Sequence, residues 1–427
     1  MRSLTSLGPR YMALWVGQTV SQFGTYVAFL TLPFLVGDIT GATPENLQTL
    51  KFSLTYALET APALLAGLLV GVLLDRWHLR PIMIATDLLR ASAFFYLTAT
   101  YGNYGVGTVF VIAFIVGSMT TLFDGALYTM IPSLVSGRRL ADANSFVSAS
   151  QQANFAIGTM AAGLIAVATG GPEVGLFING ITFIVSAICL IWVGRVDVHT
   201  HQGERSRFLT EAADGIRYLW SEPRLRITTI SAAIPNFVIG FVEATIVILF
   251  PVVLGTANEA EIGVVVAAMG VGGIIGAVAA PRVIMMLGLG RTMAIGMTMA
   301  GCLLFAVFFT HYGVVTLLLS AGWMIGISLI NVPLTTIRQH YATPAMLGRV
   351  ITASRAIGWA TLPIGALVGG WLGDSLETLP TVSRVFSLLL VITAAWLFTT
   401  VIWSDTFGPH FEGRHTRRKT SPAESTS

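Results

Sequence analysis

Long apolar stretches alternate with short charged segments along this chain, and the alternation repeats twelve times between Tyr11 and Trp403. Each apolar stretch holds about the ~20 residues that a helix needs to cross ~30 Å of hydrocarbon. The pattern therefore predicts an all-α integral membrane protein with twelve membrane-spanning helices. The expected spans are residues 11–36, 50–74, 81–101, 106–131, 144–169, 174–194, 227–254, 262–286, 292–311, 314–336, 350–372 and 383–403.

The longest polar interruption, residues 195–226, separates six predicted spans from six. The expected domains are an N-terminal six-helix bundle (1–194), a cytoplasmic linker (195–226), a C-terminal six-helix bundle (227–403) and a disordered basic tail (404–427). Within the linker, one face of a helical wheel collects the apolar residues Phe208, Ala212, Gly215, Ile216 and Leu219. This periodicity favours an amphipathic helix along the membrane surface, and a solvated linker is the alternative.

Basic residues lie almost entirely on one side of the predicted bundle. Of the 24 Lys and Arg residues, 21 fall on the side that carries both termini. Lys51 and Arg384 fall on the other side, and Arg90 lies within a span. By the positive-inside rule, the basic side and both termini are expected to be cytoplasmic. The expected location is a bacterial-type inner (plasma) membrane.

Glycine positions indicate that the two halves are copies of one another. Gly67 and Gly71 in span 2 recur 205 residues later as Gly272 and Gly276, in span 8. Gly158 and Gly163 in span 5 recur 207 residues later as Gly365 and Gly370, in span 11. We therefore expect two six-helix pseudo-repeats with a binding site between them.

Composition narrows the classes of function. The chain is 54% hydrophobic and 11% charged, whereas an ordinary soluble domain is roughly 25% charged. Its two lysines, Lys51 and Lys419, follow no glycine-rich loop, which excludes P-loop ATP hydrolysis. Cys189 and Cys302 belong to no disulfide or metal-binding pattern. We expect no enzyme activity, metal, cofactor or nucleic-acid partner, and a monomer.

Two segments carry a family resemblance. Residues 71–80, GVLLDRWHLR, resemble the signature loop of the major facilitator superfamily at Gly71, Leu73, Asp75, Arg76 and Arg80, but depart from it at His78 and Leu79. Residues 123–145 resemble the span 4–5 connection in the branch that contains enterobactin exporters and macrolide efflux proteins. The resemblance implies the twelve-helix fold of that superfamily.

The resemblance also implies a charged latch at the cytoplasmic side, which holds the halves together while the cavity faces outward. Its expected members are Gly71, Asp75, Arg76, Arg80, Arg90 and Asp124. We expect Asp124 at the end of span 4, on the cytoplasmic face. The alternative for these residues is simple interfacial anchoring.

Two acids within spans, Glu59 and Glu243, are candidates for proton coupling, because ionisable groups inside a membrane are costly and usually functional. The alternative is a neutral, hydrogen-bonded acid that only packs helices. A carboxylate at Glu243 would also attract a cationic substrate.

Polar residues at helical spacings predict a cavity lined by Gln18, Gln22, Tyr56, Asn154, Asn236, Asn331 and Trp359. For each amide, hydrogen bonding between helices is the alternative. Arg355 is the only basic residue expected near that cavity, which argues against an organophosphate exchanger.

These features predict a secondary active transporter that exports an amphipathic organic molecule, such as a drug, a macrolide or a siderophore-like metabolite. Its partners would be that substrate, protons and membrane lipid, with transport by alternating access in exchange for protons. The alternatives are an importer, a uniporter or a lipid flippase of the same fold, and a non-transporting membrane sensor.

Overall fold

A computed structural model describes residues 7–41, 48–63, 78–135, 139–194, 207–254, 259–310, 313–343, 346–373 and 378–400, which are helical apart from short connections. The helices are α1 (Pro9–Thr40), α2 (Thr49–Thr60), α4 (Leu79–Ala99), α5 (Val106–Leu134), α6 (Arg139–Thr169), α7 (Glu173–Val193), α8 (Arg207–Ser221), α9 (Pro223–Leu254), α10 (Glu259–Leu287), α11 (Leu289–Val307), α12 (Gly313–Tyr341), α13 (Leu347–Leu372) and α14 (Thr378–Leu397).

Ten of the described helices are long and apolar enough to cross a membrane, and each coincides with a predicted span. The other two predicted spans have a different status. Span 2 is described only in its first part, as α2, because residues 64–77 lie outside the described ranges. Span 11 corresponds to α13, a 26-residue helix that does not belong to the ten.

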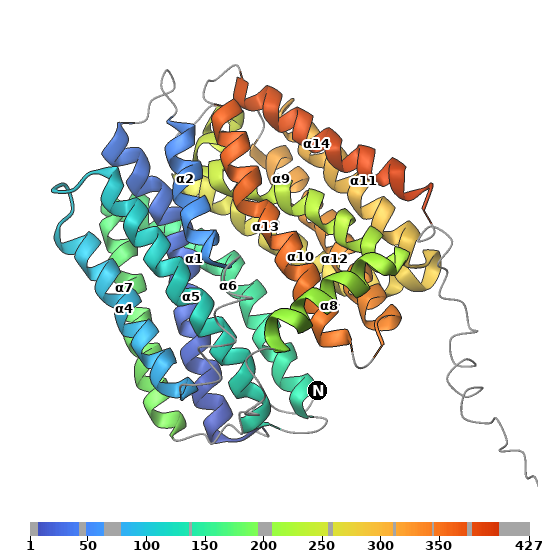
Figure 1. The fold of residues 1–427 in the computed structure, drawn as a ribbon. Helices are drawn as coiled ribbons and strands as arrows, with labels where there is room; N and C mark the ends of the chain where they lie inside the picture. The colour runs from blue at the N-terminus through green and yellow to red at the C-terminus, as the bar shows by residue number, and fades with distance from the viewer. Residues whose placement is uncertain are drawn as a thin grey trace, which may run out of the picture.

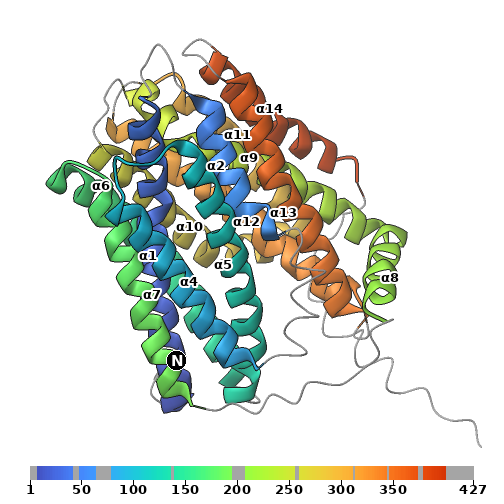
Figure 2. The same cartoon turned by 60° about the vertical axis from the view of Figure 1, so that its left-hand side comes forward.

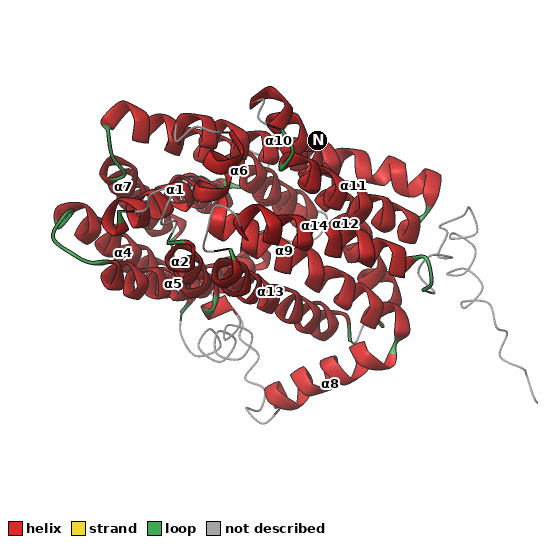
Figure 3. Cartoon of the chain, turned by 90° about the horizontal axis from the view of Figure 1, so that it is seen from above, coloured by secondary structure: helices red, strands yellow, loops and turns green. Residues whose placement is uncertain are grey.

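The linker forms the predicted helix α8, which packs against α13 and α9 at the edge of the bundle (Figure 3). Leu219 is fully buried beside Leu225 and Val350. Ile216, predicted on the same apolar face, is 41% exposed and lies outside that cluster. Phe208 and Ala212 lie where no side chain is described.

The helices gather into two groups, α1–α7 and α9–α14 (Figures 1 and 2). Within each group, glycines allow equivalent helices to approach. A Cβ atom added at Gly158 of α6 would lie 3.0 Å from the Phe23 carbonyl oxygen of α1. A Cβ atom added at Gly365 of α13 would clash with the Phe237 carbonyl oxygen of α9. The glycines that recur 207 residues apart therefore occupy equivalent helix contacts.

Glycines also allow close contacts between the two groups, which meet chiefly where α6 packs on α10 and where α2 packs on α13. A Cβ atom added at Gly263 of α10 would lie 3.2 Å from the Cα of Gly163. A Cβ atom added at Gly370 of α13 would clash with Ser53 of α2. Gly163 and Gly370 thus both lie at group-to-group contacts. Gly67 and Gly71, the other predicted repeat partners, lie outside the described residues.

Both group-to-group contacts lie at one end of the bundle. They join the start of α2 to the end of α13, and the end of α6 to the start of α10. In Figure 1 this is the upper end, where α2 and α13 lie side by side. It is the end that the arginine distribution assigns to the outside, so we call it the outer end.

Candidate functional site

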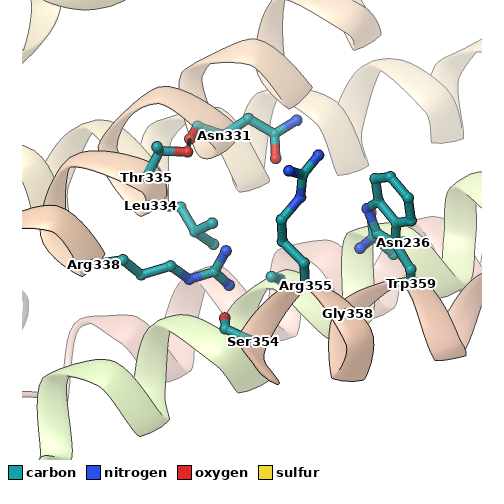
Figure 4. Close-up of a pocket in the computed structure, with 10 residues that line it drawn as sticks. Asn236, Asn331, Leu334, Thr335, Arg338, Ser354, Arg355, Gly358 and Trp359 are labelled. Carbon is teal, nitrogen blue, oxygen red and sulfur yellow. Dashed lines mark hydrogen bonds between the residues drawn. The ribbon is translucent and has the colours of Figure 1, made fainter. Parts of the chain in front are cut away.

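A cavity of about 500 Å³ lies among α9, α12 and α13, toward the end of the bundle opposite the outer contacts. Figure 4 shows the residues that line it. Its lining residues are Ala232, Asn236, Asn331, Leu334, Thr335, Arg338, Ser354, Arg355, Gly358 and Trp359. They come from the first half of α9, the second half of α12 and the first half of α13.

Helical spacing places these side chains in the cavity. Asn331, Thr335 and Arg338 are separated by four and three residues, and therefore share one face of α12. Gly358 leaves room for Asn236, because a Cβ atom there would lie 3.1 Å from Asn236 Nδ2.

Hydrogen bonds fasten the wall formed by α9 and α13. The hydroxyl oxygens of Thr229 and Ser354 lie 3.0 Å apart, and Thr361 Oγ1 donates to the Ala233 carbonyl oxygen at 2.8 Å. These two hydrogen bonds hold α9 and α13 together, and these helices form the cavity wall that faces α12.

Two arginines face this cavity. The Arg338 side chain is 6% exposed, and its Nε and Nη2 atoms have no hydrogen-bond partner among the described residues. The Arg355 guanidinium carbon lies 4.9 Å from the centre of the Trp359 ring. The prediction that Arg355 would be the only basic residue near the cavity was therefore wrong. The face of α12 shared with Asn331 is the sequence signal that could have identified Arg338.

The predicted lining residues divide into two sets. Asn236, Asn331 and Trp359 line the cavity. Asn154 does not: its Nδ2 atom donates to the Thr19 carbonyl oxygen at 2.8 Å and so joins α6 to α1.

Gln18 and Gln22 lie on α1, outside the α9–α12–α13 cavity. Gln18 is 1% exposed, and neither polar atom of its amide has a partner in the described part of the chain. The Oε1 atom of Gln22 is likewise buried and without a described partner.

Tyr56 and Glu243 connect the two groups of helices. The Tyr56 hydroxyl on α2 donates a 2.5 Å hydrogen bond to Glu243 Oε2 on α9. Glu59 lies one helical turn further along α2, close enough to Glu243 for the two carboxyl groups to interact electrostatically. The backbone of Glu59 packs directly against Gly117 of α5, where any side chain would clash. The two predicted coupling acids thus meet at the boundary between the groups.

Of the predicted latch residues, Gly71, Asp75 and Arg76 lie outside the described residues. In this structure Arg80 joins α4 to α7, since its Nε and Nη2 atoms donate to the carbonyl oxygens of Leu190 and Ile191 at 2.8 and 2.9 Å. These carbonyls belong to the last turn of α7, and that of Ile191 also accepts the Gly194 N–H at 3.3 Å.

Arg90 and Asp124 lie within helices that are candidate membrane spans. The expectation that Asp124 ends span 4 was wrong, because α5 continues ten residues beyond it, to Leu134. Asp124 interacts electrostatically with both Arg90 of α4 and Arg355 of α13. Arg90 forms a buried ion pair with Asp87, at 2.5 Å.

Comparison with known proteins gives a consistent picture. A family model described as Major Facilitator Superfamily matches residues 14–361. The chain is 25% identical to the multidrug efflux pump Tap of Mycolicibacterium fortuitum, over 87% of this chain and 90% of that protein. It is 23% identical to macrolide efflux protein A of Streptococcus pyogenes, over 86% and 89% of the two chains.

Among solved structures, the chain resembles the nucleoside transporter NupG, with a TM-score of 0.71 and 15% sequence identity. The match covers 92% of this chain and all of that one. At this identity the likeness establishes the shared fold, and the substrate of that transporter is a property of that protein.

Proposed function

Because the chain belongs to the major facilitator superfamily, we propose that it is a secondary transporter that exports an amphipathic organic molecule in exchange for protons. The hydrogen bond between Tyr56 and Glu243 carries this proposal, because it joins the two groups of helices through an ionisable residue. The two efflux proteins among its relatives support the direction of transport.

The bond offers a physical route from protonation to movement. A carboxylate forms a stronger hydrogen bond with the Tyr56 hydroxyl than a neutral acid does, because hydrogen bonds to charged groups contribute about 1.5–3 kcal/mol. Coupling free energies between sites are of the same size, about 1–3 kcal/mol. Protonation of Glu243 would weaken the Tyr56 contact and favour separation of α2 from α9. Glu59, one turn away, is the second proposed coupling acid.

Alternating access requires the outer contacts to open and the opposite end to close. We propose twelve spans with both termini in the cytoplasm of a plasma membrane, and a monomer. In the outward-facing state Gly71, Asp75, Arg76 and Arg80 would form the inner latch, with Arg90 and Asp124 supporting it from within the bundle. Gln18, Gln22 and Asn154 would line the path on the α1 side.

Everted membrane vesicles test the proposal. With an acidic lumen and a luminal pH-sensitive dye, a panel of cationic, neutral and anionic amphipathic molecules is added, and the transported members should release luminal protons. Glu243→Gln should abolish this release, whereas Asp214→Asn, at an exposed position of α8, should not. Substrate-driven proton release that persists in Glu243→Gln would remove Glu243 from the coupling role, and uptake without proton movement would indicate a uniporter.

A further inference from the structure

The cavity among α9, α12 and α13 holds two positive charges and no acidic side chain among its described lining residues. The two guanidinium groups repel each other, since both line this one cavity (Figure 4). Asp124 of α5 interacts with Arg355. Arg338 has no such partner among the described residues, so the net charge of the site is positive.

Arg338 is the more informative of the two arginines. It is almost completely buried, and two of its nitrogen atoms lack a described hydrogen-bond acceptor. A buried charge without hydrogen bonds is strongly unfavourable unless another group completes its shell. The planar fork of arginine matches the two oxygens of a carboxylate or phosphate. The unfilled donors therefore indicate an anionic group as the missing partner.

The surroundings of Arg338 suit an amphipathic anion. Asn236, Asn331 and Thr335 supply neutral hydrogen-bonding groups around the two arginines. Trp359 is 45% exposed and offers an aromatic face beside Arg355. A volume of about 500 Å³ falls within the ~300–1,000 Å³ of small-molecule sites.

We propose that this cavity binds the anionic group, a carboxylate or phosphate, of an amphipathic molecule, with Arg338 as its principal contact and Arg355 as its second. The inference rests on the proposed transport of an amphipathic molecule and specifies its charge. It differs from the cationic substrate that a carboxylate at Glu243 would attract. A free solute and an anionic lipid headgroup share this chemistry.

Equilibrium binding tests the charge preference without requiring transport. The purified protein in phosphatidylcholine nanodiscs is titrated with 11-(dansylamino)undecanoate, followed by dansyl fluorescence, and with its methyl ester and its trimethylammonium analogue. The carboxylate should bind at least about tenfold more tightly than either analogue, the scale of a charged hydrogen bond. Equal or tighter binding of the trimethylammonium analogue overturns the proposal, using the native chain alone.

Variants then locate the site. Arg338→Gln should weaken carboxylate binding about tenfold or more and leave binding of the methyl ester unchanged, which also shows that the variant is folded. Arg338→Lys should recover part of the loss, since it restores the charge without the fork. Arg217→Gln, at an exposed arginine of α8, should have no effect. Carboxylate affinity that is unchanged in Arg338→Gln overturns the assignment.

A last arm distinguishes the two sources of the anion. Nanodiscs that contain phosphatidylglycerol should displace the carboxylate probe if a lipid headgroup is the ligand, and should leave it bound if the ligand is a free solute. Either result supports an anion site. The vesicle measurement of proton release is independent, so loss of one property without the other separates this inference from the proposed coupling.

Discussion

The guanidinium of Arg90 lies 2.5 Å from the Asp87 carboxylate on the same helix, and both side chains are almost completely buried. Two aromatic rings complete the surroundings, with the Arg90 guanidinium carbon 4.7 Å from the centre of the Phe123 ring and 4.2 Å from that of Phe183. The ion pair therefore joins α4 to α5 and α7 inside the first group of helices.

Breaking this pair should be costly. Asp87→Asn removes the ion-pair partner of the buried Arg90 charge and leaves only its electrostatic interaction with Asp124. We expect a loss of about 3–5 kcal/mol in the free energy of unfolding. Thermal unfolding in detergent, followed by size-exclusion fluorescence, measures the effect. The double variant Asp87→Leu/Arg90→Met should recover most of the lost stability, because it removes both charges. If the double variant is as unstable as Asp87→Asn, the unpaired Arg90 charge is not the cause of the lost stability.

Removing the Tyr56 hydroxyl should shift the balance between conformations. Tyr56→Phe keeps the ring but removes the donor to Glu243, so the closed outer end should lose about tenfold in relative population. Spin labels at Thr40 of α1 and Thr378 of α14, which lie at the outer ends of opposite groups, report this shift as a distance distribution. Thr55→Val, whose hydroxyl donates to a carbonyl oxygen within α2, serves as the control. Identical distributions in Tyr56→Phe and the native chain would contradict the proposed role of this bond.

Because α9 and α13 lie so close together, adding a methyl group between them should lower the stability of the protein. Gly365→Ala places a methyl group against the Phe237 carbonyl oxygen and should cost about 1–3 kcal/mol in stability. Gly107→Ala, which meets open space near the start of α5, should be neutral or slightly stabilising. A thermal shift assay compares the two variants, and equal melting temperatures would mean that α13 moves away without penalty.

At the contact between α2 and α13, an added methyl group should change opening of the outer end and transport rather than stability. Gly370→Ala introduces a methyl group against Ser53, between the groups rather than within one. We expect near-native stability but a more open outer end, and a lower rate of substrate-driven proton release. Accessibility of a cysteine at Thr49 to an impermeant thiol reagent should rise. Protection unchanged from the native protein would argue that this contact does not limit opening.

An alkaline transition is expected from the connection after α4. The Tyr101 hydroxyl donates to Asp38 at the end of α1; desolvation first, and then this bond, raises the pKa of Tyr101 above its usual value. Since the folded-state pKa exceeds the unfolded one, the contact is fully present below about pH 10 and is lost as the pH rises further. Tyr101→Phe should flatten the fall in melting temperature above that pH. An unchanged alkaline profile would assign the loss to other groups.

Sequence periodicity predicts the helices well, because a span needs only length and an unbroken apolar character. The glycines that recur along the sequence also point to equivalent helix contacts, since a side chain at Gly158 or Gly365 would come too close to the backbone of a neighbouring helix. Periodicity cannot decide which polar face of a helix meets a partner helix and which meets a cavity. Asn154 and Asn331 are both amides within spans, yet one bonds the backbone of α1 and the other lines the cavity.

Arg338 shows the same difficulty for a charged residue. Near the end of a predicted span, an arginine satisfies the positive-inside pattern and needs no further explanation. Its burial depends on the helices that pack around α12, which only tertiary packing establishes. The position of Asp124 differs from the prediction for a related reason. The polar and proline residues among 128–133 are typical of the approach to a loop, although α5 continues through them.

Asn236 and Glu243 lie two turns apart on α9, so the cavity is roughly 10 Å nearer to the arginine-rich end of the bundle than the Tyr56–Glu243 bond is. With the outer ends closed, a solute entering from that end encounters Arg338 and Arg355 before it reaches Glu243, the proposed coupling acid. A molecule that does not bind these two arginines would therefore leave the cavity before the Tyr56–Glu243 bond breaks. No proton would be transported for such a molecule.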